Sequence, residues 1–230
     1  MTKTLAKISL AVYFLIGMHP VAPSIGETGL YLTNNIIGWV IIGTLIGISF
    51  WHLSIHGNLQ YSLFLIISIV AFLLLIVPMY YRYNFFAEMT TYRMAFLAGG
   101  IIFYLSILQF GFGDKEKKSL LYLFLIAAVI QSVIGIFQYY GSPWGSFGHK
   151  DVMTVFMATG ISISLFYLNF HHDFPYGKVK KYLSYLIYVM PFTGALILSV
   201  APSTVAYAGL FVAIVLQVNM TKFKDRSVQI

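Results

Sequence analysis

Cysteine is absent from the 230-residue sequence, and charged residues make up only 9% of it. Without cysteine, the chain can form neither a disulfide framework nor a thiolate metal site. Soluble domains carry about 25% charged residues, because charged side chains keep their surfaces hydrated. The small charged fraction, together with a hydrophobic content of 59%, therefore predicts an integral membrane protein.

The alternation of apolar and polar residues that marks a membrane β-barrel is also absent. Continuous apolar runs such as SLFLIISIVAFLLLIVPMYY occur instead. A hydrocarbon core about 30 Å thick requires roughly 20 apolar residues per helix, and lipid-exposed backbone must satisfy its own hydrogen bonds. We predict an all-α fold, a polytopic membrane helix bundle.

The apolar runs divide residues 1–230, which we treat as a single transmembrane domain, into about eight transmembrane helices. The expected spans are Leu5–Met18, Ile36–Leu53, Tyr61–Tyr80, Met94–Gly111, Ser119–Tyr139, Val152–Phe170, Tyr182–Ser199 and Thr204–Val218. The first span, with Lys3 and Lys7 at its start, also has the features of a secretory signal peptide. We favour a retained helix, because no A-x-A cleavage pattern follows the run.

Lysine and arginine predict the orientation, since cytoplasmic loops are enriched in them near helix ends. With the N-terminus inside, only Arg82, Arg93 and Lys150 fall on the outer side. The cytoplasmic segments hold the others: Lys3, Lys7, Lys115, Lys117, Lys118, Lys178, Lys180, Lys181, Lys222, Lys224 and Arg226. Both termini are then cytoplasmic, and the net charge of +7 reflects topology rather than nucleic-acid binding.

The stretch GSFGHKDVM places His149, Lys150 and Asp151 in a glycine-rich outer loop just before the sixth span. Backbone N–H groups at that helix start, with His149 and Lys150 beside them, would form an anion site at the membrane surface. A simpler alternative needs no ligand: Asp151 caps the helix and Lys150 extends toward the headgroups. The residues alone leave both open.

Familiar catalytic and cofactor-binding motifs are missing at usable positions, including the nucleophile elbow, the P-loop, HExxH and the dinucleotide fingerprint. His171 and His172, with Asp173 next to them, are interpreted as a solvated loop rather than a metal site. Gln131 and Gln138 lie seven positions apart on one face of the fifth span and are expected to bind a neighbouring helix. No metal and no cofactor is predicted.

Three blocks resemble bacterial protein O-oligosaccharyltransferases, the pilin-glycosylation branch of the O-antigen ligase family. The first is MHPVAPSIGETGLYLTNNIIGW, where the matching positions are His19, Pro20, Gly26, Gly29, Leu32, Asn35 and Trp39. The second, YRMAFLAGGIIFYLSILQF, is similar to the family's arginine-led fourth span. The third, GIFQYYGSPWGSFGHKDVMTVFMATGISISLFYL, looks like the family's glutamine-rich loop and its Ala-Thr-Gly helix.

The resemblance implies a membrane glycan ligase of the bacterial inner membrane, a glycosyltransferase. It would transfer oligosaccharide from undecaprenyl-pyrophosphate to a pilin-like protein or to the lipid A core on the periplasmic side. Arg93, His149 and Lys150 are the residues expected to hold the carrier pyrophosphate, with Asp151 positioning the loop. The alternative is a noncatalytic membrane subunit or a small-solute transporter.

The matching blocks correspond to the N-terminal part of such an enzyme. The family's large outer loop and final spans, which carry catalytic basic residues, have no counterpart after Ile230. We therefore expect that residues 1–230 by themselves do not transfer glycan.

Overall fold

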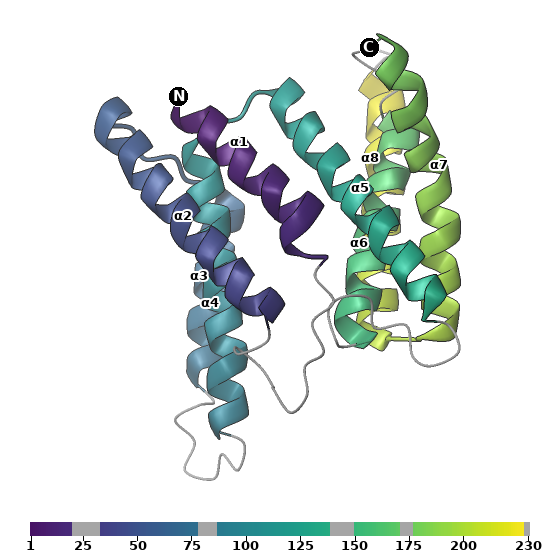
Figure 1. Ribbon diagram of the computed structural model, residues 1–230, viewed down its shortest axis with the longest axis horizontal. Coiled ribbons are helices and arrows are strands. Elements are labelled where there is room, and N and C mark those ends of the chain that lie inside the picture. The colour runs from purple at the N-terminus through teal and green to yellow at the C-terminus, as the bar shows by residue number, and fades with distance from the viewer. Residues whose placement is uncertain (20–32, 78–86, 139–149, 171–176, 228–230) are drawn as a thin grey trace. The chain divides into compact units, whose positions relative to one another are not determined.

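The computed structural model describes residues 1–19, 33–77, 87–138, 150–170 and 177–227, and these residues are almost entirely helical (Figure 1). The described elements are α1 (Thr2–Val12), the π-helical turn η1 (Tyr13–Gly17), α2 (Thr33–His56), α3 (Leu63–Ile76), α4 (Ala87–Gln109), α5 (Asp114–Phe137), α6 (Lys150–Phe170), α7 (Gly177–Val200) and α8 (Thr204–Ser227). The predicted all-α fold is confirmed over these residues.

Three of the described helices are long and apolar enough to cross a membrane, namely Ile36–His56, Asp114–Phe137 and Asp151–Asn169. Four shorter apolar helical segments accompany them: Leu63–Ile76, Met94–Gln109, Ser184–Val200 and Thr204–Asn219. The membrane character of the chain is thus supported by its helices, whereas the number of eight spans remains a prediction.

The chain forms two compact units, Met1–Lys117 and Lys118–Ile230, which we call unit 1 and unit 2 and describe separately. The boundary lies within the first turns of α5. Each unit has its own set of packed helices.

Successive helices of unit 1 reverse direction, as contacts at one of its ends show. The side chain of Thr2, at the start of α1, meets His52 near the end of α2 at 2.7 Å. The Gln109 side chain, at the end of α4, bonds to the backbone of Gln60 just before α3. One end of unit 1 therefore carries the start of α1, the end of α2, the start of α3 and the end of α4.

Lys7 of α1 also binds Glu116 of α5 at 2.9 Å, so the first turn of α5 lies at this same end. We call this the basic end of unit 1, because it holds Lys3, Lys7, Lys115 and Lys117. The alternation of helices is the arrangement expected for a chain that crosses a layer repeatedly.

Two close approaches join the other helices of unit 1. Gly17 lies against Ile37 of α2, where an added Cβ would come within 3.0 Å of the isoleucine methyl. Gly99 of α4 lies under the indole of Trp39, and a Cβ there would come within 2.5 Å of the ring. Small residues permit these contacts because they let one helix approach another closely.

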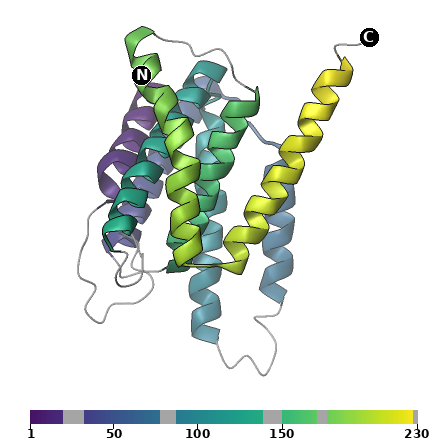
Figure 2. The ribbon, with the colours of Figure 1, turned by 90° about the vertical axis from the view of Figure 1, so that its right-hand side faces the viewer.

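Unit 2 has a more continuous core, in which α6 packs against both α7 and α8 (Figure 2). Its buried residues are Tyr122, Leu125, Ala128, Met153, Met157, Tyr167, Ile187, Met190 and Ile197. Three glycines lie against this core: Gly135 on Met153 and Ile197, Gly160 on Met190 and Ala128, and Gly194 on Ile161 and Met190. Pro191 lies inside α7, where it removes one backbone donor from the helix.

Helices of unit 2 also alternate in direction. The Tyr167 hydroxyl, near the end of α6, donates to the carbonyl of Lys118, near the start of α5. Gln217 of α8 donates to the carbonyl of Ser162 of α6 at 2.8 Å, while the start of α8 packs on Leu198 at the end of α7. The starts of α5 and α7 and the ends of α6 and α8 therefore share one end of the unit. This basic end of unit 2 carries Lys118, Lys178, Lys180, Lys181, Lys222, Lys224 and Arg226.

Candidate functional site

The predicted anion site falls at the beginning of α6, which starts at Lys150. Asp151 is the second helical residue and lies in the first turn, close to the expected cap position. Its side chain is exposed, and its backbone carbonyl accepts a hydrogen bond from the Thr154 hydroxyl at 3.0 Å. His149 and the side chain of Lys150 lie outside the described residues.

A helix start of this kind can attract an anion, because the first backbone N–H groups lack partners within the helix and the helix dipole is positive there. Asp151 already supplies one negative charge at this position and stabilises the helix by the same effect. A phosphate at this site would therefore need cationic groups to offset its repulsion by Asp151. Lys150 stands at the right place in the sequence to provide one.

Arg93 lies in α4 of unit 1, sixteen positions before the end of that helix at Gln109. Its side chain is outside the described part of the chain. Its backbone lies in the first half of α4, away from the basic end of unit 1. Arg93 belongs to unit 1, whereas Lys150 and Asp151 belong to unit 2. Each residue is therefore described within its own unit.

A polar cluster that the sequence did not predict lies at the basic end of unit 1. His52 is only 6% exposed, and its Nδ1 lies 2.7 Å from the Thr2 hydroxyl. The His52 ring stacks on that of His56, with centroids 4.1 Å apart, and also packs against Phe110. The only sequence signal for this cluster was the spacing of two histidines at i and i+4, which places them on one helix face.

Lysines complete this end of unit 1. The Lys3 ammonium donates to the carbonyl of Gly111 at 3.1 Å, and the Lys7 ammonium donates to Glu116 at 2.9 Å. The second carboxylate oxygen of Glu116 accepts from the backbone N–H of Gly113. These bonds tie α1 to the connection between α4 and α5, so their first role is structural.

Metal binding finds no support among the described side chains, where no group of three histidine, cysteine or acidic residues comes together. The predicted loop of His171, His172 and Asp173 lies outside the described residues. At His52 and His56, nearby Lys3 would oppose a cation, because like charges repel at short range.

His19, part of the first block of resemblance, follows η1 and is held by a hydrogen bond between its Nε2 and the Phe14 carbonyl at 2.8 Å. Partial burial lowers the pKa of His19 below its usual value, and the bond to the carbonyl acts in the opposite direction. The neutral imidazole is therefore favoured where the first helix ends.

Polar residues within the helices of unit 2 serve packing. Gln131 is fully buried on α5, as its predicted role in contacting a neighbouring helix requires. Gln217 joins α8 to α6 through the Ser162 carbonyl. Small residues of α6 also let helices approach closely, as at Gly160, where an added Cβ would lie 3.1 Å from that of Ala128.

No protein-family model matches the chain, and no curated protein or solved structure matches it either.

Proposed function

We propose that this chain is a polytopic inner-membrane protein of the glycan ligase type, which binds an undecaprenyl-pyrophosphate-linked oligosaccharide at the start of α6. The observation that carries the proposal is that α6 begins at Lys150, with Asp151 in its first turn. The polar stretch interpreted as a phosphate-binding loop thus leads directly into a helix N-terminus. The proposed reaction and carrier are taken from the resemblance of the surrounding sequence block to O-oligosaccharyltransferases.

In this proposal the chain crosses the membrane eight times, with both termini in the cytoplasm. Alternating helix directions within each unit support it, as does the position of the lysines. All but three of the 14 lysine and arginine residues fall at the basic ends or in the segments next to them. The carrier site then faces the periplasm, where a lipid-linked glycan would be presented to a pilin-like protein or to the lipid A core.

The pyrophosphate would be held by Lys150 and His149, with Arg93 as a further cationic residue on the same side of the membrane. These groups would stabilise the charge that develops on the leaving pyrophosphate as an acceptor hydroxyl attacks the sugar. Asp151 fixes the helix start from which the loop departs. The transporter alternative requires ionisable groups near the middle of the bilayer, whereas His52 and His56 lie at the end of α2.

Topology can be tested with single cysteines, since the chain has none of its own. An impermeant thiol reagent added to whole cells should label a cysteine at Ser146 and leave one at Ser227 unlabelled until the membrane is permeabilised. Labelling of the cysteine at Ser227 but not of the one at Ser146 would show that the orientation is the reverse of the one proposed. The start of α6 would then face the cytoplasm, on the wrong side for a periplasmic ligase.

Carrier binding can be tested separately. Lys150→Gln and Arg93→Gln should each weaken retention of undecaprenyl-pyrophosphate glycan by the purified protein, roughly 10- to 100-fold, since a charge-assisted phosphate contact contributes about 1.5–3 kcal/mol. Lys117→Gln is the matched control, because Lys117 lies at the basic end and pairs with Asp114. Equal retention by all three variants would contradict carrier binding by Lys150 and Arg93. The start of α6 would then need no ligand, and Asp151 would serve only to stabilise the helix start.

A further inference from the structure

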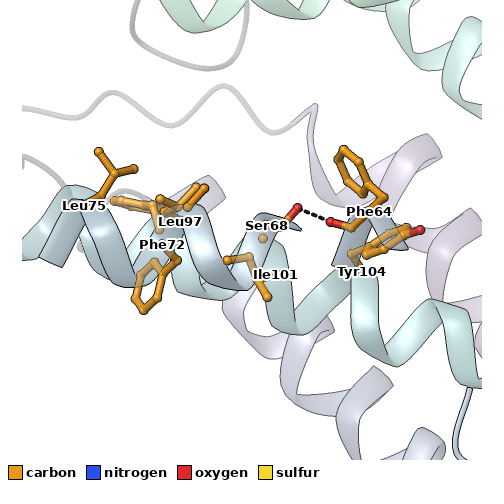
Figure 3. A pocket seen from close by; sticks show the side chains of 10 residues that line it. Phe64, Ser68, Phe72, Leu75, Leu97, Ile101 and Tyr104 are labelled. Atoms are coloured by element: carbon orange, nitrogen blue, oxygen red, sulfur yellow. Dashed lines mark hydrogen bonds between the residues drawn. The ribbon is translucent and has the colours of Figure 1, made fainter. Parts of the chain in front are cut away.

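A groove of about 340 Å³ runs between α3 and α4 of unit 1 (Figure 3). On α3 its lining residues are Phe64, Ser68, Ala71, Phe72 and Leu75, which follow one face of the helix. The span from Phe64 to Leu75 corresponds to a groove length of about 16 Å at 1.5 Å rise per residue. The groove is therefore long relative to its volume.

On α4 the lining residues are Phe96, Leu97, Gly100, Ile101 and Tyr104. Gly100 is exposed, and a Cβ added to it would meet nothing within 4 Å. Together with Ala71 and Ser68, it provides small side chains where the two helices face each other. Larger side chains, including Phe64 and Phe96, border them.

The hydroxyl groups in and beside the groove have partners within the protein. Ser68 donates to the carbonyl of Phe64 at 2.8 Å, and the Tyr104 hydroxyl lies 3.0 Å from that of Ser62. Water held in a cavity needs two to four polar partners, and these bonds leave few available. The interior thus suits hydrocarbon, with a polar pair of hydroxyls at one end.

A second helix fits this groove poorly. A helix is about 10 Å across with its side chains, and helices in membranes associate through small residues that let backbones approach. Here the borders are bulky, and Phe64 and Leu75 remain 64% and 53% exposed. A thin, flexible chain can enter between such side chains where a helix cannot.

We propose that the groove between α3 and α4 binds one acyl chain of a membrane phospholipid, with the lipid headgroup at the Ser62 and Tyr104 end. This rests on the proposed membrane-spanning placement of α3 and α4. Because hydrocarbon surrounds the protein in a bilayer, the selectivity for this position comes from van der Waals contact along the groove. A retained chain would also fill the space that α3 leaves beside α4.

The test uses the full chain in vesicles of phosphatidylglycerol and phosphatidylethanolamine that contain a phospholipid with a photoreactive diazirine on its acyl chain. After irradiation, labelled positions are mapped by mass spectrometry. Phe72 and Leu97 in the groove should be labelled several-fold more than Val40 and Phe50, which are exposed on α2 and do not line this groove.

Gly100→Ile should reduce groove labelling several-fold, because its side chain would occupy the groove. Gly47→Ile is the matched control, since Gly47 of α2 is also exposed and also faces open space. Equal labelling of groove and α2, or equal labelling in both variants, would overturn the acyl-chain site alone. If neither the groove nor α2 is labelled, the proposed membrane placement is wrong.

Two further results identify a different occupant. Loss of groove labelling on addition of undecaprenyl phosphate, but not of an equal amount of phospholipid, would assign the groove to a polyprenyl chain. Crosslinks from α3 to a second copy of the chain, in place of lipid adducts, would assign it to a protein contact. Either result overturns the proposal.

Discussion

A continuous core of apolar side chains lies in unit 2, whereas several described polar contacts of unit 1 gather at its basic end. In unit 2 the glycines at 135, 160 and 194 each lie against a neighbouring side chain. In unit 1, Gly43, Gly47 and Gly100 face open space. Glycine therefore has two roles in this chain: at some positions, including Gly17 and Gly99 of unit 1, it lets helices approach closely, and at others, including Gly209 of unit 2, it leaves surface open.

The physical reason lies in the solvent. Between helices in a bilayer, hydrocarbon surrounds every apolar face, so burial of such a face yields little, and association depends on close packing and hydrogen bonds. In unit 2 the helices are held mainly by close packing. In unit 1 hydrogen bonds contribute more, at the basic end, where Lys3, Lys7, His52 and Gln109 make their bonds.

Gly160→Leu should give the largest effect, because an added Cβ already comes within 2.6 Å of the Met190 methyl. Overpacking of this kind costs about 1–3 kcal/mol. The free energy of unfolding, measured by detergent titration in mixed micelles, should fall by that amount. Gly209→Leu is the control in the same unit, because Gly209 faces open space and the change favours helix. A similar loss in both variants would contradict the close packing of unit 2.

Gln109→Leu should have a smaller effect, in unit 1. The Gln109 amide accepts from the backbone N–H of Gln60 and donates to its carbonyl, each at 2.9 Å. Loss of these bonds should lower the free energy of unfolding by about 1–2 kcal/mol. Gln60→Ala is the control, since these bonds use only the backbone of Gln60. If the control is destabilised as much as Gln109→Leu, the bonds to Gln109 do not hold this end together.

The smallest effect concerns pH. Since the pKa of His19 is lowered in the folded chain, its neutral form contributes stability that is present above the unfolded pKa of about 6.5 and is lost as pH falls through the folded value. The wild-type chain should lose stability between pH 7.5 and pH 5.5, by less than either variant above. His19→Gln should show a weaker dependence in the same titration. An unchanged pH dependence would exclude His19 as its source.

The helices could be predicted from apolar runs, but their ends could not. The run beginning at Ser119 predicted the fifth span, whereas α5 begins at Asp114, because Asp114 and Glu116 favour a helix start and hydropathy gives them no weight. Likewise α1 begins at Thr2, before the apolar run at Leu5. Helices continue beyond the apolar region wherever polar residues cap or extend them.

The polar cluster of His52 and Thr2 was beyond prediction for another reason. These residues are 50 positions apart, and hydropathy does not say which helix ends meet. For the proposed site, the sequence placed Lys150 and Asp151 in the loop just before a sixth span beginning at Val152, whereas α6 already begins at Lys150. Whether they bind a phosphate depends on Arg93 and His149 as well, and stays a prediction.

The pairing of Lys7 with Glu116 has a consequence for the order of synthesis. The two residues are 109 positions apart, so the first helix cannot complete its contacts until α5 has begun to emerge. Once residue 117 has been made, however, every partner in unit 1 exists, and the unit can close while unit 2 is still on the ribosome. Domains generally fold as units in this N-terminal-first order. The carboxylate of Glu116 is therefore among the last of the described partners in unit 1 to be synthesised.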